Sequence, residues 1–183
     1  MKVAQLTAAG IVMDVIEGKN LNKVFEKYSH ENKINSKDIS QIKDLVFGTL
    51  RSYGKTKFVI NKLVKRIPSN PLILTLLHIA LFQLIFNRSN SYTVVDQAVS
   101  ASNMINKRHT KFINGVLRAF LREKVSILEK AEKIDEAKYS YPIWWINLIK
   151  NEYPISWNNI LDIGNSHPPL IIRVNIKKGS ISN

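Results

Sequence analysis

Hydrophobic residues recur at helical spacing through most of the chain. Between residues 3 and 17 the apolar positions lie three or four apart and build one helical face, and Gly18 and Asn20 end the pattern. Further helices are predicted over 21–30, from Ser36 onwards with a break or kink at Gly54, over 71–86, from Thr93 or Asp96 onwards, and from Lys111 to about Ala131. We therefore expect an all-α bundle in the first part of the chain.

The stretch PLILTLLHIALFQLIF at 71–86 is apolar nearly all round, so other helices must surround it. It is shorter than the roughly 20 residues that a bilayer requires, and it contains Thr75, His78 and Gln83. We expect a buried central helix and no membrane partner. His78 is then predicted to be a hydrogen-bonded core histidine.

The pattern changes beyond the polar connection that ends at Pro142. PIWWINLIKNEYP and ISWNNILDI predict two short amphipathic helices, and their tryptophans are expected to pack between this tail and the bundle. LIIRVNI, residues 170–176, is the one good strand candidate, and a lone strand is not stable. We therefore predict a helical domain over 1–132, followed over 133–183 by linker helices and the first strand of a truncated, mixed α/β subdomain.

Charge narrows the function classes. The chain has 27 Lys and Arg against 14 Asp and Glu, a net charge of +13, which favours a polyanionic partner such as nucleic acid. It has no cysteine, which excludes disulfides and thiol catalysis, and its four histidines lack the spacing of metal ligands. No signal peptide is visible, so a cytoplasmic location is expected.

The stretch KFINGVLR carries Asn-Gly, which between apolar residues usually indicates a hairpin. Its flanks are helical, however, and Lys111, Arg118 and Arg122 fall in a narrow band opposite the apolar half of that helix. Gly115 lies at the edge of the band beside Asn114, although glycine inside a helix costs about 0.5–1 kcal/mol against alanine. Either a phosphate or partner backbone approaches Gly115, with Asn114 donating a hydrogen bond, or another helix of the same fold packs over it.

A second basic cluster is RSYGKTKFVINKLVKR, which has six basic residues and no acid. If the helix continues through Gly54, then Arg51, Lys55, Lys62 and Arg66 share one face. That face either binds a polyanion or is simply solvated.

Three segments resemble a known family. Phe47-Gly-Thr-Leu-Arg51, Leu81-Phe-Gln-Leu84 and Phe112-Ile-Asn-Gly-Val-Leu-Arg118 resemble, in order and spacing, the NusB-like all-helical RNA-binding domain. That domain occurs alone as the antitermination factor NusB and as the N-terminal domain of RsmB-type 16S rRNA cytosine-5 methyltransferases. The segments around Tyr141-Pro-Ile-Trp144 and Pro168-Pro-Leu-Ile-Ile-Arg173 resemble the methyltransferases, which favours that form.

The resemblance implies a role in holding 16S rRNA, with a ribosomal protein as a further partner to consider. The family transfers methyl from S-adenosylmethionine through a cysteine nucleophile. This chain has no cysteine and no glycine-rich loop after a strand, so we expect no catalytic residue and no cofactor in it, and no activity alone. The expected RNA-binding residues are Arg51, Lys55, Lys62, Arg66, Lys107, Arg108, Lys111, Asn114, Arg118, Arg122, Arg173 and Asn175.

Two alternatives stay open. One is a NusB-type antitermination factor that binds a short single-stranded leader RNA. The other is a helical protein-interaction module with no RNA role. The first 18 residues contain only one basic residue, Lys2, so RNA binding through an arginine-rich N-terminus is not expected.

Overall fold

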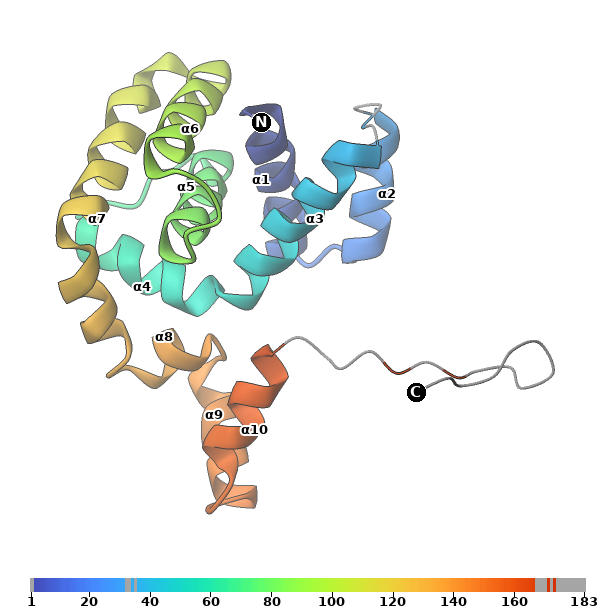
Figure 1. Cartoon of the computed structure of the whole chain (residues 1–183), viewed down its shortest axis with the longest axis vertical. Helices are drawn as coiled ribbons and strands as arrows, with labels where there is room; N and C mark the ends of the chain where they lie inside the picture. Colours follow the sequence, from blue (N-terminus) through green and yellow to red (C-terminus); the bar gives the residue numbers. More distant parts are fainter. Residues whose placement is uncertain (1, 32–33, 35, 167–170, 172, 174–183) are drawn as a thin grey trace, which may run out of the picture.

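The computed structural model describes residues 2–31, 34, 36–166, 171 and 173, and the regular elements in that part of the chain are all helical. They are α1 (Lys2–Ile16), α2 (Leu21–Glu31), α3 (Ser36–Arg51), α4 (Tyr53–Leu63), α5 (Pro71–Ile85), α6 (Ser91–Ile105), the 3-10 turn η1 (Lys107–His109), α7 (Thr110–Ala131), α8 (Asp135–Tyr139), α9 (Ile143–Glu152) and α10 (Trp157–Asn165). Figure 1 shows α1 to α7 as a bundle and α8 to α10 as an extension at its lower end. The predicted all-α bundle is confirmed.

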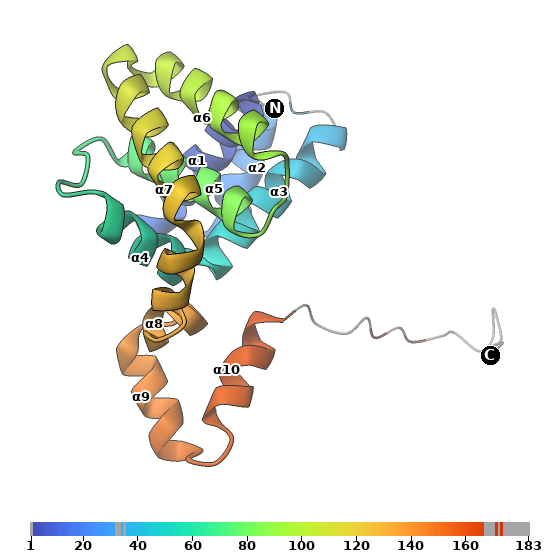
Figure 2. The ribbon, with the colours of Figure 1, turned by 60° about the vertical axis from the view of Figure 1, so that its left-hand side comes forward.

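Helix α5 is the centre of the bundle, as its apolar sequence predicts (Figure 1, Figure 2). One face, including Ile73, Leu77 and Leu81, packs into a cluster with α4, α6 and α7. Another face, including Leu76 and Ile79, packs with α1 and α3. Both sides of α5 are therefore covered, and the core of the bundle consists of two clusters, one on each side of this helix. None of the helices in the described part combines the length and apolarity needed to cross a bilayer.

His78 is the core histidine that the sequence predicts. It is buried on α5, its Nδ1 lies 2.6 Å from Thr56 Oγ1, and its ring stacks on Tyr53 with centroids 4.5 Å apart. Burial, with a smaller contribution from the charge of Lys57, lowers the pKa of His78 to about 4. The histidine is therefore neutral at pH 7.

The break between α3 and α4 lies at Ser52, two residues before the predicted break at Gly54. The Ser52 hydroxyl donates to the carbonyl oxygen of Gly48 at 2.7 Å, and the Ser52 backbone N–H donates to the same oxygen at 3.0 Å; side-chain bonds of this kind often bend a helix. Since α4 also ends at Leu63, the helix is not continuous from Arg51 to Arg66, and the condition under which the four basic residues would share one face is not met.

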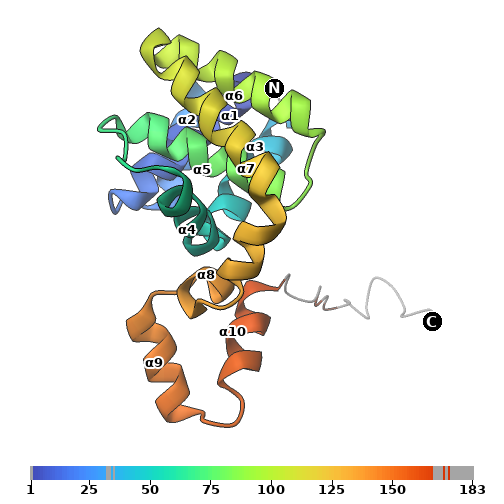
Figure 3. The same ribbon diagram turned by 90° about the vertical axis from the view of Figure 1, so that its left-hand side faces the viewer.

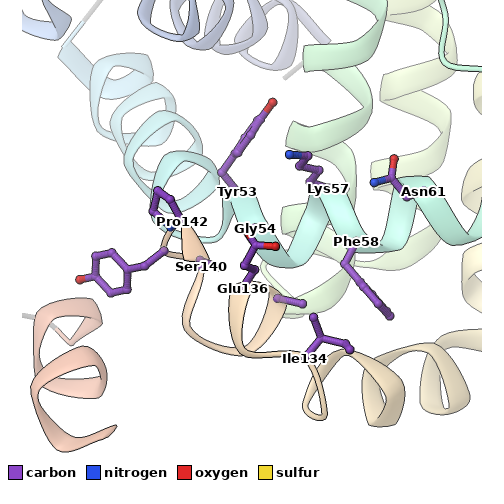
Figure 4. Close-up of a pocket in the computed structure, with 11 residues that line it drawn as sticks. Tyr53, Gly54, Lys57, Phe58, Asn61, Ile134, Glu136, Ser140 and Pro142 are labelled. Atoms are coloured by element: carbon purple, nitrogen blue, oxygen red, sulfur yellow. The ribbon is translucent and has the colours of Figure 1, made fainter. Parts of the chain in front are cut away.

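Gly54 has a different role, which is to allow close packing of α4 on α8. A Cβ at this position would overlap the carbonyl oxygen of Glu136 and lie 2.8 Å from the Cα of Ser140. Ser140 adopts a left-handed conformation (φ 57°), and its hydroxyl oxygen accepts a hydrogen bond from the Lys55 backbone N–H at 3.3 Å. Figure 4 shows Gly54 facing Glu136 and Ser140. The polar connection predicted before Pro142 thus contains a short helix, because α8 caps and packs against α4.

Helix α6 begins earlier than predicted. Asn90, and not Thr93 or Asp96, is the residue before the helix, and its side-chain oxygen accepts from the Tyr92 N–H at 2.9 Å. An asparagine N-cap satisfies a backbone donor that has no partner inside the helix, so it fixes the start at Ser91, two residues before the earlier predicted start at Thr93.

Helices α9 and α10 lie side by side below the bundle and share a small core with α8 (Figure 2, Figure 3). Buried Tyr139, Ile146, Ile149 and Leu161 form this core. Trp145 and Trp157 pack against it, and the Trp144 residue is 66% exposed. The prediction that the tryptophans pack between tail and bundle is therefore wrong, because the tail helices bury them among themselves or leave them in solvent.

The predicted strand over 170–176 lies outside the described residues except for Ile171 and Arg173, which are exposed and carry no regular structure. Asn175 lies outside the described residues. The predicted boundary between residues 132 and 133 remains a prediction.

Candidate nucleic-acid interface

Helix α7 carries an exposed basic face. Its apolar half, which includes Ile113, Leu117 and Phe120, is buried in the core of the bundle, and this burial orients the opposite side to solvent. Lys111, Arg118 and Arg122 are exposed and follow one stripe along about 16 Å of the helix. None of the three forms an ion pair with a carboxylate in the described part of the chain. The stripe is therefore a set of uncompensated cations.

The Asn-Gly pair lies on the same helix. Gly115 is exposed, and a Cβ placed there would have no described atom within 4 Å other than those of its chain neighbours and of the surrounding backbone of α7. Asn114 is half-buried. The alternative that another helix of this fold packs over Gly115 is therefore wrong for the residues that the structure describes. The other alternative, approach by a phosphate or a partner backbone, remains a prediction.

The turn η1 extends this basic face towards the start of α7. Lys107 and Arg108 are both exposed, and the Asn106 side-chain oxygen accepts from the Arg108 N–H at 3.0 Å, which holds the turn. We call Lys107, Arg108, Lys111, Arg118 and Arg122 the α7 basic face. The structure thus places these five predicted residues on consecutive elements.

The second predicted cluster is divided by the break at Ser52. Arg51 and Lys55 line a cavity of about 280 Å³, whereas Lys62 lies over the ring of Phe58, 5.4 Å from its centroid. Arg66 is exposed in the segment between α4 and α5. The four residues, which would share a face only on one continuous helix, therefore lie on separate segments.

Sequence reasoning missed the other residues of that cavity. Arg88, between α5 and α6, and Lys138, on α8, join Arg51 and Lys55, with Phe82 and Phe86 in the same lining. We call this cavity the basic–aromatic pocket. Arg88 and Lys138 both lie outside the two basic clusters of the sequence. Lys138 reaches the pocket because α8 packs closely on α4.

The cations of the pocket are only partly neutralised. Lys55, with a side chain 18% exposed, pairs with Glu132 at 2.7 Å, and Arg88 lies 3.8 Å from the carboxylate of Asp44. Arg51 has no ion pair with the described residues. Hydrogen bonding to the Tyr139 side chain is the main cause that raises the pKa of Lys138, so this lysine is charged at pH 7.

A further cavity of about 280 Å³ lies where α8 meets α4 (Figure 4). Its lining includes Tyr53, Lys57, Asn61 and Glu136. The Glu136 carboxylate accepts from the Ile143 N–H at 3.2 Å and so caps the start of α9. The lining contains one acid, Glu136, which is engaged by this cap, and one base, Lys57. We assign no ligand to this cavity.

Arg173 is exposed, and nothing in the described structure connects it with either basic surface. Within the described residues no group of three or more His, Asp or Glu side chains is placed to hold a metal ion.

The fold is a helical bundle around one apolar helix, and its exposed surfaces are strongly basic. Residues 2–122 match the model of the NusB family, and the chain belongs to this family. Residues 141–183 match the ferredoxin-like domain described as Methyltr_RsmF/B-like. The resemblance found in the sequence is thus confirmed on both parts of the chain.

Several curated relatives share the name ribosomal RNA small subunit methyltransferase B. The chain is 36% identical over 151 residues to the probable ribosomal RNA small subunit methyltransferase B of Coxiella burnetii, an alignment that covers 79% of this chain and 34% of the relative. It is 30% identical over 177 residues to ribosomal RNA small subunit methyltransferase B of Pasteurella multocida, covering 94% and 39%. For the protein of that name from Yersinia pseudotuberculosis the identity is 32% over 173 residues, covering 93% and 40%. The chain spans between a third and two fifths of the length of these relatives.

Proposed function

We propose that this chain is the RNA-binding region of an S-adenosylmethionine-dependent 16S rRNA cytosine-5 methyltransferase, and that it positions small-subunit rRNA. The observation that carries the proposal is the α7 basic face, an unpaired row of cations beside a solvent-open glycine. The match of the tail to an RsmF/B-like domain and the names of the relatives support it.

In this proposal Lys111, Arg118 and Arg122 contact successive phosphates, and Gly115 lets the RNA backbone approach the helix closely. Asn114 donates a hydrogen bond to a phosphate or ribose oxygen. Such contacts set the register and orientation of the RNA and carry little sequence information, so the choice of nucleotide lies elsewhere. The same proposal includes a ribosomal protein as a further partner and RNA binding by Arg173 and Asn175.

The described residues do not fit S-adenosylmethionine. A Rossmann-like site for this cofactor requires a strand followed by a glycine-rich turn and a helix. The described part of the chain contains no strand, so no step through the cofactor is derived from it. In a methyltransferase of the kind that the longer relatives are named for, S-adenosylmethionine would supply the methyl group.

The test is fluorescence anisotropy of labelled 16S fragments with the full chain at several salt concentrations. The double variant R118E/R122E should weaken binding at least tenfold and reduce the salt slope by about two, since two phosphate contacts are lost. K23E/K27E is the matched control, because it makes the same charge change at the same i,i+4 spacing on α2, which lies on the opposite side of the bundle from α7 (Figure 1).

Equal losses in the two double variants would refute a defined interface on α7 and leave only net charge. A preference for a short single-stranded leader RNA over all 16S fragments would favour an antitermination factor. No RNA binding at low salt would favour the protein-interaction module.

A further inference from the structure

We propose that the basic–aromatic pocket binds one unpaired nucleotide of an RNA strand, with its phosphate at Arg51 and Lys138 and its base against Phe86. The inference rests on the proposed function and adds a second RNA contact, away from the α7 basic face. The pocket residues come from the end of α3, the start of α4, the C-terminal end of α5 and the loop after it, α8 with the following Ser140, and Asn165 at the end of α10.

The charges favour an anion. Four cationic side chains converge on a concave surface, where field lines from like charges concentrate. The two carboxylates that pair with them, Glu132 and Asp44, are about half exposed and lie outside the lining of the pocket. A phosphate that enters can therefore bind Arg51 and Lys138 without first displacing an acid from them.

The aromatic side chains favour a base. Phe82 is buried, whereas Phe86 is 45% exposed, and their ring centroids are 5.3 Å apart with the planes tilted by 45°. Arg88 lies over the Phe82 ring, 5.8 Å from its centroid. An exposed ring that rests on a buried one is held in place, and a nucleobase can stack on such a ring or on a guanidinium plane.

The concavity favours a single strand. A base inside a duplex has neighbours on both faces, so it cannot place a face against a ring in the wall of a pocket. An unpaired base needs no extrusion and enters at no cost in pairing. A cation row without a pocket, as on α7, makes no such distinction.

The binding test uses the full chain and a labelled 12-nucleotide single-stranded RNA, with the matching duplex and free AMP as competitors. F86A should weaken single-strand binding at least fivefold while the salt slope stays the same, because it removes a stacking surface and no charge. F86L retains apolar packing on Phe82 and should show a similar loss. F47A is the control, because Phe47 is 42% exposed on α3 and does not line the pocket.

Charge variants test the phosphate position separately. R51A and K138A should each lower the salt slope by about one, whereas K23A on α2 should leave it unchanged. E132Q releases Lys55 from its ion pair and should strengthen single-strand binding two- to fivefold. Tighter RNA binding in E132Q together with weaker RNA binding in F86A is the combination expected when RNA occupies the pocket.

The pocket proposal is overturned if F86A and F86L behave like F47A, or if the duplex binds as tightly as the single strand does and is weakened equally by F86A. It is also overturned if AMP competes as well as the 12-mer, because the ligand would then be a free nucleotide. In each of these cases the loss in R118E/R122E would still support the proposed function. Absence of any RNA binding would remove both.

Discussion

Gly54 and Gly115 form a natural pair for a stability experiment, because the same substitution should act in opposite directions at the two sites. Both residues are helical, Gly54 on α4 and Gly115 on α7. At Gly115 an added Cβ meets no described atom, so G115A should stabilise the bundle by about 0.5–1 kcal/mol through reduced backbone entropy in the unfolded chain.

At Gly54 the same entropic gain is opposed by a collision with backbone. The Cβ would overlap the carbonyl oxygen of Glu136, and a backbone atom cannot move aside as a flexible side chain can. Overpacking of this kind costs about 1–3 kcal/mol. Displacement of α8 would also break the Lys55–Ser140 hydrogen bond, worth about 1 kcal/mol. G54A should therefore destabilise the protein by about 1–3 kcal/mol.

Urea unfolding, followed by far-UV circular dichroism and by tryptophan fluorescence, measures both effects. The three tryptophans, at 144, 145 and 157, all lie in α9 and α10, so fluorescence reports the part of the chain that α8 connects to the bundle. G54A should lower the fluorescence midpoint more than the dichroism midpoint. If G54A raises both midpoints as G115A does, then α8 does not pack on α4 as described, and the position assigned to Lys138 in the pocket is wrong as well.

Other predictions concern the core and its caps. The pKa of His78 in the folded protein, about 4, is below its ordinary value of 6.5, so the unfolded chain binds more protons between these two pH values. The free energy of unfolding should therefore be full above pH 6.5 and fall by about 2 kcal/mol from pH 7 to pH 5. In H78L the urea midpoint should depend less on pH over the same range. N70A should cost about 1 kcal/mol in thermal unfolding and N70S much less, since the Asn70 side chain accepts two backbone N–H groups at the start of α5. Gln5 donates to Gln83 at 2.6 Å in the core, so Q5L should cost about 1–3 kcal/mol by leaving a buried amide unpaired, and the double variant Q5L/Q83L should recover part of that loss in the same assay.

Local patterns determine much of this fold, and those parts were predictable. The apolar run of α5 predicts burial on every side, and the prediction for His78 follows from it. The α7 basic face was equally accessible, because a helical wheel places Lys111, Arg118 and Arg122 together without any knowledge of the rest of the chain.

Features that depend on contacts between distant segments were not predictable. The apolar period continues from α3 into α4, and although Gly54 predicts a break nearby, the pattern does not place it at Ser52. The turn is supported by Phe82 packing in the space beside Gly48 and by α8 packing on Gly54, contacts that only the folded chain provides. The basic–aromatic pocket depends on the same packing, which is why Arg88 and Lys138 could not be assigned to a site.

The glycines make the strongest argument for a functional surface on α7. The ring of Phe82 occupies the space that a side chain at Gly48 would fill, and the backbone of α8 does the same at Gly54, so packing inside the molecule accounts for both. Gly115 has no such neighbour, yet it weakens the helix that carries it and lies within the row of Lys111 and Arg118. If RNA backbone fills this space, G115A should raise the urea midpoint and weaken binding of the 16S fragment about three- to tenfold in the anisotropy assay. A stabilised variant that binds the fragment as tightly as the parent chain would show that Gly115 has no part in the interface, and the α7 basic face would then have to act through its charges alone.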